Sequence, residues 1–239
     1  MPTMPTVQWL ASTPSTMDVA AAFAHDGAAA GTVIAADEQT AGRGRRGATW
    51  ASPPGAGLYC SYVARPSSAN LSLLTLAAGV GVREGIRDVT GLAVDLKWPN
   101  DLVIGRRKLA GILAEGQAIG TPAQAVIIGI GVNVLTSSYP PDIAVRATSL
   151  EGELGRPIDR HALLDAVVSR LGERLSQLDD RPGDILRAWR AGSPNAMGTR
   201  VSWDGKSGVT AGIDDAGALL IDTGTGVERV IAGELHWML

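Results

Sequence analysis

A short loop at residues 42–47 carries the side chains best suited to chemistry. It reads Gly42-Arg43-Gly44-Arg45-Arg46-Gly47 and follows an apolar run that ends shortly before Gln39. Glycine lets a backbone approach a ligand closely, and arginine presents planar donors that match carboxylate and phosphate. Arg/Gly mixtures also occur in disordered RNA-binding tails, so the six residues by themselves leave an anion-binding loop and such a tail about equally open.

A second group of charged residues lies in the middle of the chain. Lys97 and Asp101 bracket an expected turn, and Lys108 opens the second strand of an expected hairpin. Strand alternation would put Lys108 on the same face as Ala110 and Ile112, where it could reach over a ligand. A solvated lysine in an Arg-Arg-Lys turn is the simpler alternative. Asp101 could help to hold Mg²⁺, which typically takes one or two carboxylates plus substrate phosphates, or could cap a turn.

Two further stretches also allow two interpretations. Ser15 precedes an expected helix and has Asp18 three residues later, which fits a capping box. Alternatively, the exposed amides of this helix start, with the Ser15 and Thr16 hydroxyls, could hold a polar ligand group. Gly129 and Gly131 interrupt an apolar strand, where they permit tight packing or let a flat nucleotide lie against the backbone.

The elements that must position these residues alternate between strands and helices. Strands are expected at 7–10, 32–39, 57–64, 94–98, 102–104, 109–113 and 125–134, and helices from 15, at 70–89, from 159 and at 184–191. The Gly/Arg loop therefore lies between two strands, unlike a tail. After Gly192 only short strands follow, at 200–203, 209–213, 218–221 and 227–237, which suggests a small barrel. We expect an α/β protein with domains at 1–191 and 192–239.

Composition narrows the class of protein. Of 239 residues, 45% are hydrophobic and 19% charged, which argues against disorder, and the net charge of −3 disfavours a general nucleic-acid binder. The chain has one cysteine, Cys60, so no internal disulfide can form, and we expect the protein to work in a reducing cytoplasm. Cys60 lies inside an expected strand, where we expect it to pack rather than to react. The three histidines show no metal-ligand spacing, and neither a signal peptide nor a membrane-spanning run of apolar residues is visible.

Four motifs in a fixed order resemble those of the biotin protein ligases. They are the Gly/Arg loop at 42–47, Lys-Trp-Pro-Asn-Asp at 97–101, Lys-Leu-Ala-Gly-Ile-Leu at 108–113 and Gly-Val-Asn at 131–133. The resemblance covers most of 7–190, and Gly233-Glu234 is similar to the Gly-Glu of the family's C-terminal barrel. It implies a mixed sheet with flanking helices, an SH3-like barrel, and a monofunctional enzyme. Such enzymes form biotinyl-5′-AMP from biotin and ATP with Mg²⁺, then biotinylate a lysine of the biotin carboxyl carrier domain.

The resemblance also implies roles for individual residues. Arg43, Arg45 and Lys108 would neutralise the biotin carboxylate and the α-phosphate, whose mutual repulsion opposes reaction. The full set of ligand-binding residues would be Ser15, Thr16, Gln39, Gly42, Arg43, Gly44, Arg45, Trp50, Lys97, Asn100, Asp101, Lys108, Gly111, Gly131 and Asn133, with Asp101 also at the metal. Met17 stands where the family usually has asparagine at the ureido ring. A loop that orders over the adenylate would exclude water, so we expect residues 42–50 to be mobile without ligand.

Rival functions are less consistent with the sequence. Lipoate protein ligases share the fold, but lipoate lacks the ureido group that Ser15, Thr16 and Gln39 would bind. Some biotin ligases are also DNA-binding repressors, yet the catalytic pattern here begins by Ser15, which leaves no room for a helix-turn-helix of that kind. We expect no DNA or membrane partner, and a monomer or a homodimer.

Overall fold

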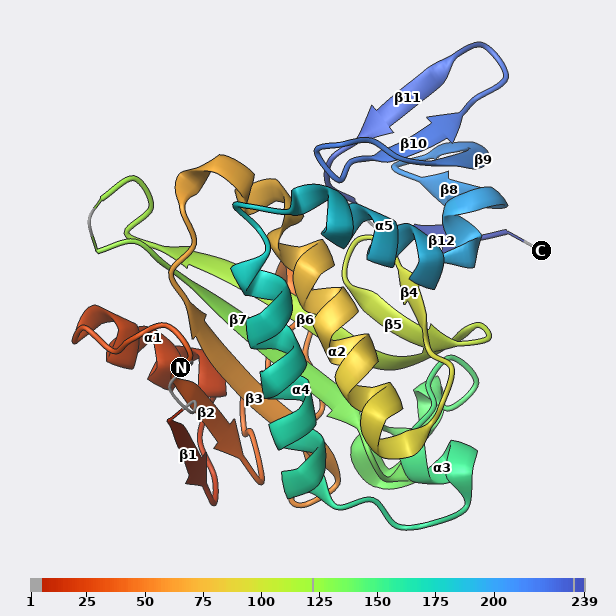
Figure 1. Cartoon of the computed structure of the whole chain (residues 1–239). Helices are drawn as coiled ribbons and strands as arrows, with labels where there is room; N and C mark the ends of the chain where they lie inside the picture. The colour runs from red at the N-terminus through yellow and green to blue at the C-terminus, as the bar shows by residue number, and fades with distance from the viewer. Residues whose placement is uncertain (1–5, 122, 234, 239) are drawn as a thin grey trace.

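A seven-stranded mixed sheet forms the centre of the molecule (Figure 1). The computed structural model describes residues 6–121, 123–233 and 235–238, and its strand order is β1-β2-β3-β7-β6-β5-β4. The strands are β1 (Val7–Leu10), β2 (Val33–Ala36), β3 (Gly57–Ala64), β4 (Asp95–Lys97), β5 (Asp101–Ile104), β6 (Arg107–Gln117) and β7 (Ala125–Asn133). β1 and β2 pair in parallel, whereas the other neighbours are antiparallel. The expected mixed α/β sheet is confirmed.

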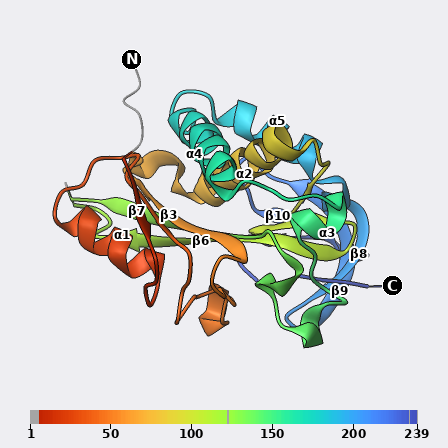
Figure 2. The ribbon, with the colours of Figure 1, turned by 90° about the horizontal axis from the view of Figure 1, so that it is seen from below.

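Helices cover both faces of this sheet (Figure 2). α2 (Leu74–Thr90), α4 (Arg160–Ser176) and α5 (Pro182–Gly192) lie on one face, and α1 (Thr16–His25) lies on the other. The expected helix at 70–89 begins later because residues before Leu74 form a 3₁₀ segment, and the short α3 (Leu150–Leu154) is an element that periodicity did not indicate. The 3₁₀ segments are Arg45–Gly47, Ser68–Leu73, Thr136–Ser138, Pro141–Ile143 and Pro194–Ala196.

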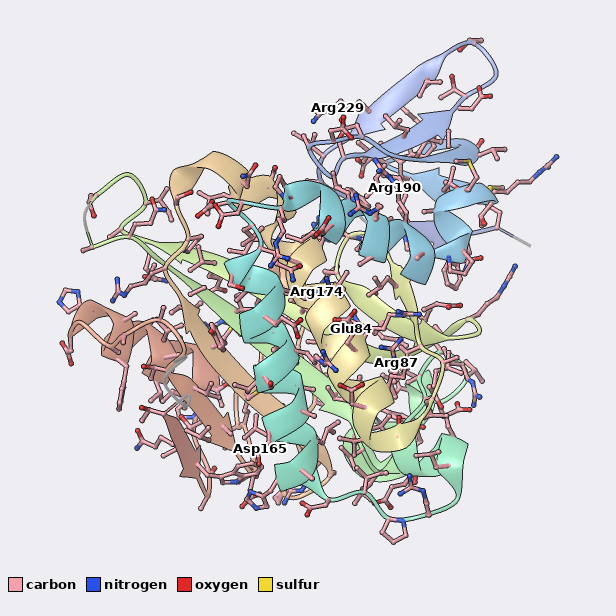
Figure 3. All side chains as sticks on the ribbon, in the orientation of Figure 1. Glu84, Arg87, Asp165, Arg174, Arg190 and Arg229 are labelled. Carbon is pink, nitrogen blue, oxygen red and sulfur yellow. The ribbon has the colours of Figure 1, made fainter. Side chains whose placement is uncertain are left out.

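Small residues bring α2 and α4 into backbone contact. A Cβ added at Gly85 would lie 2.6 Å from Val167 Cα, so only glycine allows this approach. Beside the contact, Arg174 Nε donates to Glu84 Oε2 at 2.8 Å, and this ion pair joins α4 to α2 (Figure 3). The hydrogen bond with Glu84 raises the pKa of Arg174. The helix pair thus forms a rigid support behind the sheet.

A second, five-stranded antiparallel sheet follows α5. Its strands are β8 (Met197–Trp203), β9 (Lys206–Ile213), β10 (Leu219–Asp222), β11 (Val227–Val230) and β12 (His236–Trp237), in the order β11-β10-β9-β8-β12. This confirms the small C-terminal β structure. The single strand expected at 227–237 is wrong, because β11 pairs with β10 whereas β12 crosses to pair with β8.

The two sheets share buried contacts. Trp98 Nε1 donates to Gly217 O at 3.1 Å, and Ser193 Oγ donates to Leu96 O at 2.7 Å. The domain division at 191/192 stays a prediction; Glu234 of the C-terminal motif lies outside the described residues. Among the described residues, no helix combines the length and apolar character that a bilayer crossing requires.

Candidate active site

A pocket of about 440 Å³ lies on the face of the sheet that carries α1. The start of α1, the 42–50 loop and strands β5, β6 and β7 contribute its walls. Most of the predicted ligand-binding residues meet there: Ser15, Thr16, Gln39, Arg43, Gly44, Arg45, Trp50, Asn100, Asp101, Lys108, Gly111 and Gly131. We call this cavity the loop pocket.

A second cavity of about 490 Å³ adjoins the loop pocket, and we call it the outer pocket. Lys97 and Asn133 line it, and it shares Trp50, Asp101 and Lys108 with the loop pocket. Its other lining residues include Arg106 and His236, and also Arg146 and Trp237, which the sequence did not single out. The outer pocket is therefore rich in cations and bordered by an aromatic ring from β12.

The Gly/Arg loop forms a narrow hairpin over the sheet. Trp50 N donates to Gly42 O at 2.9 Å, and Gly44 N donates to Ala48 O at 2.6 Å. Gly42 lines neither pocket but forms the base of the hairpin, where an added Cβ would lie 2.4 Å from Trp50 O. Arg46 at the tip has φ 55°, in the left-handed region. The mobility of this loop without ligand stays a prediction.

The first two arginines of the loop point to different partners. Arg45 Nη1 donates to Asn100 Oδ1 at 3.2 Å and to Gly233 O at 3.1 Å, so it joins the loop to the residue before β5 and to the segment between β11 and β12. Arg43 is held at the rim by carboxylates of Asp18 and Glu115. The hydrogen bond with Asp18 raises the pKa of Arg43. Arg45 thus lies beside the pocket wall, while Arg43 ties the loop to its surroundings.

Lys108 lies on the opposite face of β6 from the one that alternation predicts. The pairing of β5 with β6 shifts register between Leu102 and Val103, whose partners are Ala110 and Lys108, so Leu109 is an extra residue. Such a bulge turns the side chains on one side of it to the other face of the sheet. Lys108 Nζ consequently reaches the pocket face, 2.6 Å from Asp101 Oδ1.

Trp50 separates the two cavities. A Cβ added at Gly131 would lie 2.4 Å from Trp50 Cε2, and one added at Gly111 would lie 3.0 Å from Cζ3, so the indole rests on paired glycines of β6 and β7. Lys108 Nζ is 5.4 Å from the ring centroid. The buried Trp50 Nε1 has no hydrogen-bond partner in the part of the chain that the structure describes. The two glycines are therefore required for the ring to lie flat against the sheet.

A hydrogen-bond chain runs from the loop pocket into the protein: Thr16 and Gln39 line the pocket, and two buried serines lie behind them. Thr16 Oγ1 donates to Gln39 Oε1 at 3.0 Å and shares a 2.8 Å hydrogen bond with Ser61 Oγ, and Gln39 Nε2 donates to Ser52 Oγ at 2.9 Å. The sequence missed Ser61, whose only signal was a hydroxyl in a wholly buried strand. Polar groups at this depth are available to a ligand with both donors and acceptors.

The start of α1 fits a simple N-cap rather than a reciprocal capping box. Ser15 Oγ accepts from Met17 N at 3.3 Å, while Asp18 pairs with Arg43. Met17 is buried and lines the loop pocket, with its sulfur beside Gly129: a Cβ added there would lie 2.7 Å from it. Met17 thus gives the polar end of the pocket one apolar wall.

The pocket suits electrostatic catalysis more than covalent catalysis. Arg43, Arg45, Arg46 and Lys108 face a single carboxylate, Asp101, among its described lining residues. Cys60 also lines it, but burial raises the pKa of its thiol to about 12, so the thiol is protonated and a poor nucleophile at neutral pH. No cluster of three or more His, Cys, Asp or Glu side chains suited to a metal occurs within the described ranges.

Comparisons with known proteins agree on one family. The family model described as "Biotin/lipoate A/B protein ligase family" matches residues 9–133. The chain is 34% identical over 230 residues to "Bifunctional ligase/repressor BirA" of Bacillus subtilis, covering 93% of this chain and 71% of that one. It is 34% identical over 217 residues to "Biotin--[acetyl-CoA-carboxylase] ligase" of Paracoccus denitrificans, with 85% and 89% covered.

A solved structure has the same architecture. The biotin protein ligase from Aquifex aeolicus in complex with biotin and ATP superposes with a TM-score of 0.85 at 30% identity, over 98% of each chain. The matched family region contains the loop pocket's hairpin, its sheet floor and Gly131. The chain belongs to the biotin/lipoate A/B protein ligase family.

Proposed function

We propose that this chain is an ATP-dependent biotin protein ligase. In the first step a biotin carboxylate oxygen attacks the α-phosphorus of ATP, pyrophosphate leaves, and biotinyl-5′-AMP forms. In the second step a lysine amine of a biotin carboxyl carrier domain attacks the acyl carbon, an amide forms, and AMP leaves. The named relatives and the Aquifex aeolicus complex support this assignment.

The observation that carries the proposal is the placement of two cations in the loop pocket, with Lys108 at its junction with the outer pocket and Arg45 in its wall. Biotin's carboxylate and the α-phosphate repel each other, and fixed cations between them would offset that repulsion and the charge that develops in the transition state. Lys108 borders both cavities beneath Trp50, and Arg45 borders the loop pocket. The protein needs no nucleophile of its own, because the substrate carboxylate attacks.

We assign the two cavities to the two substrates. Thr16 and Gln39, which line the loop pocket and are oriented by Ser61 and Ser52, would offer donors and acceptors to the ureido ring. Lipoate presents no ureido group and would form fewer hydrogen bonds with these polar side chains, which disfavours it. The cationic outer pocket, with Lys97 and Asn133, suits the nucleotide.

Mg²⁺ would enter with the nucleotide. Asp101 is the carboxylate at the junction and lies beside Lys108, which fits an ion that takes one protein carboxylate and several phosphate oxygens. Bound there, the ion would neutralise phosphate charge. We propose these roles for the residues named above. We also propose that the protein works in a reducing cytoplasm and is a monomer or a homodimer.

The direct test is transfer of biotin to a carrier domain, followed by mass spectrometry. The unaltered chain should add one biotin to the acceptor lysine when biotin, ATP and Mg²⁺ are present. Lys108→Ala and Arg45→Ala should each slow the reaction by about 100- to 1,000-fold, as loss of one preorganised donor does. Arg107→Ala is the matched control, since Arg107 is on the same hairpin as Lys108 but lines neither cavity and pairs with Glu153 of α3. No transfer by folded protein would refute the function; full turnover by both variants would refute the site.

A further inference from the structure

The rim of the loop pocket carries an ion-pair cluster that the proposed chemistry does not use. Arg43 contacts Asp18 with both terminal nitrogens, Nη1 to Oδ2 at 3.0 Å and Nη2 to Oδ1 at 2.8 Å. Arg43 Nη2 is also 3.5 Å from Glu115 Oε2. A guanidinium held by a carboxylate in this two-point manner has a fixed orientation as well as a fixed position.

The three side chains come from three separate elements around the pocket. Asp18 is in the first turn of α1, Arg43 is in the loop, and Glu115 is on β6. Glu115 follows Gly111 and Leu113 at alternate positions of β6, and both of those line the pocket, so Glu115 extends the same face to the rim. The cluster therefore bridges the pocket mouth.

The hairpin geometry couples the position of Arg43 to the arm of the loop that leads to Trp50. Arg43 and Thr49 face each other across the hairpin, and the backbone bonds between Gly42 and Trp50 hold its base together. Fixing Arg43 against α1 and β6 thus fixes the opposite arm, which leads into Trp50. Arg45 holds the other side of the hairpin through Asn100 and Gly233, so Arg43 is the side-chain anchor toward α1 and β6.

We propose that Asp18 and Glu115 are positioning residues that act through Arg43 as a latch holding the 42–50 loop over the pocket. This inference rests on the proposed function only for its substrates; the latch itself is a property of the chain. Its side chains are between 36% and 59% exposed, so each ion pair is weak and is screened by salt. The latch can therefore hold the loop for a reactive intermediate and still open for the acceptor lysine.

The first test needs no substrate. Trypsin cleaves after arginine, and Arg45 and Arg46 lie in the latched hairpin. Asp18→Asn and Glu115→Gln should each raise the initial cleavage rate of the folded chain at this loop, together by about 3- to 10-fold at low salt. Glu228→Gln is the control, because it removes an exposed carboxylate that pairs with Lys206 away from the loop. Unchanged cleavage in the double variant would overturn the latch.

The second test measures retention of the intermediate. Release of biotinyl-5′-AMP should be about 3- to 10-fold faster in Asp18→Asn/Glu115→Gln than in the unaltered chain. This difference should shrink in high salt, which screens the ion pairs. The rate of single-turnover adenylation should change by less than about twofold. Exchanging the charges, with Asp18→Arg and Arg43→Asp together, should restore slow release relative to Arg43→Asp alone. Equal release rates, or a difference independent of salt, would refute the latch. Failure of the unaltered chain to make the adenylate would instead refute the proposed function. The latch would still be tested by proteolysis, which needs no substrate.

Discussion

Replacing Gly131 with alanine places a methyl group where the indole of Trp50 lies. The added Cβ would be 2.4 Å from Cε2, 2.5 Å from Nε1 and 2.8 Å from Cζ2, well inside contact distance. The sheet backbone cannot yield, because Gly131 pairs with Tyr59 on one side and Gly111 on the other. The indole is on a loop and must move instead.

The cost should therefore appear in activity more than in stability. Overpacking a fixed site costs about 1–3 kcal/mol, and here the loop can relieve it by releasing the ring from the sheet. If the displaced loop raises the activation free energy of adenylation by about 1.4–2.7 kcal/mol, adenylation should be roughly 10- to 100-fold slower. The melting temperature should change by less than about 3 °C, since the core around β7 is untouched.

A double-mutant cycle separates this explanation from a direct effect of alanine on the ligand. In a Trp50→Ala background the methyl group meets no indole, so Gly131→Ala should then slow adenylation by less than about twofold. Adenylation by all four proteins is measured as single-turnover formation of biotinyl-5′-AMP. Wild-type adenylation in Gly131→Ala, or the same fold loss in both backgrounds, would refute the placement of the ring.

Two further predictions concern stability. Gly85→Ala should lower the free energy of unfolding by about 1–3 kcal/mol in urea melts, because its Cβ would meet the backbone of Val167. Gly79→Ala on the same helix is the control, since its Cβ would meet only side-chain methyl groups, the nearest of them on Leu96 at 3.2 Å. Equal effects would contradict the helix contact. Burial raises the pKa of Cys60 from 9.0 to about 12, so the folded state holds the thiol proton more tightly and stability should fall as pH rises above 9, by about 1.4 kcal/mol per pH unit until about 12. Cys60→Ala should remove this part of the alkaline loss, and an unchanged pH profile would contradict the burial.

Local signals predicted most of the elements correctly. Asp159 caps α4 with hydrogen bonds to the amides of His161 and Ala162, as its position before an apolar periodic stretch indicated. The hairpin around Gly105 was predicted from two strand-like runs that flank a glycine, and in the structure Gly105 has φ 60°, which suits a tight turn. Such features depend on neighbouring residues, which sequence patterns record directly.

Features that depend on distant pairing were not predictable. The bulge that turns Lys108 into the pocket arises from the register between β5 and β6, and alternation along one strand cannot reveal it. The crossing of the chain from β11 to β12 depends on pairing with β8. The Asp18–Arg43–Glu115 cluster joins three elements that are far apart in the chain, so the sequence suggested only a capping role for Asp18 and no role for Glu115.

The central claim is that fixed cations at the junction of two cavities allow a biotin carboxylate to attack ATP. ATP–pyrophosphate exchange tests it most directly, measured on the unaltered chain with Mg²⁺ and either biotin or lipoate as the only acid. We predict exchange that depends on biotin, is absent with lipoate, and is lost in Lys108→Ala. Exchange with lipoate alone, or no biotin-dependent exchange by folded protein, would contradict the account.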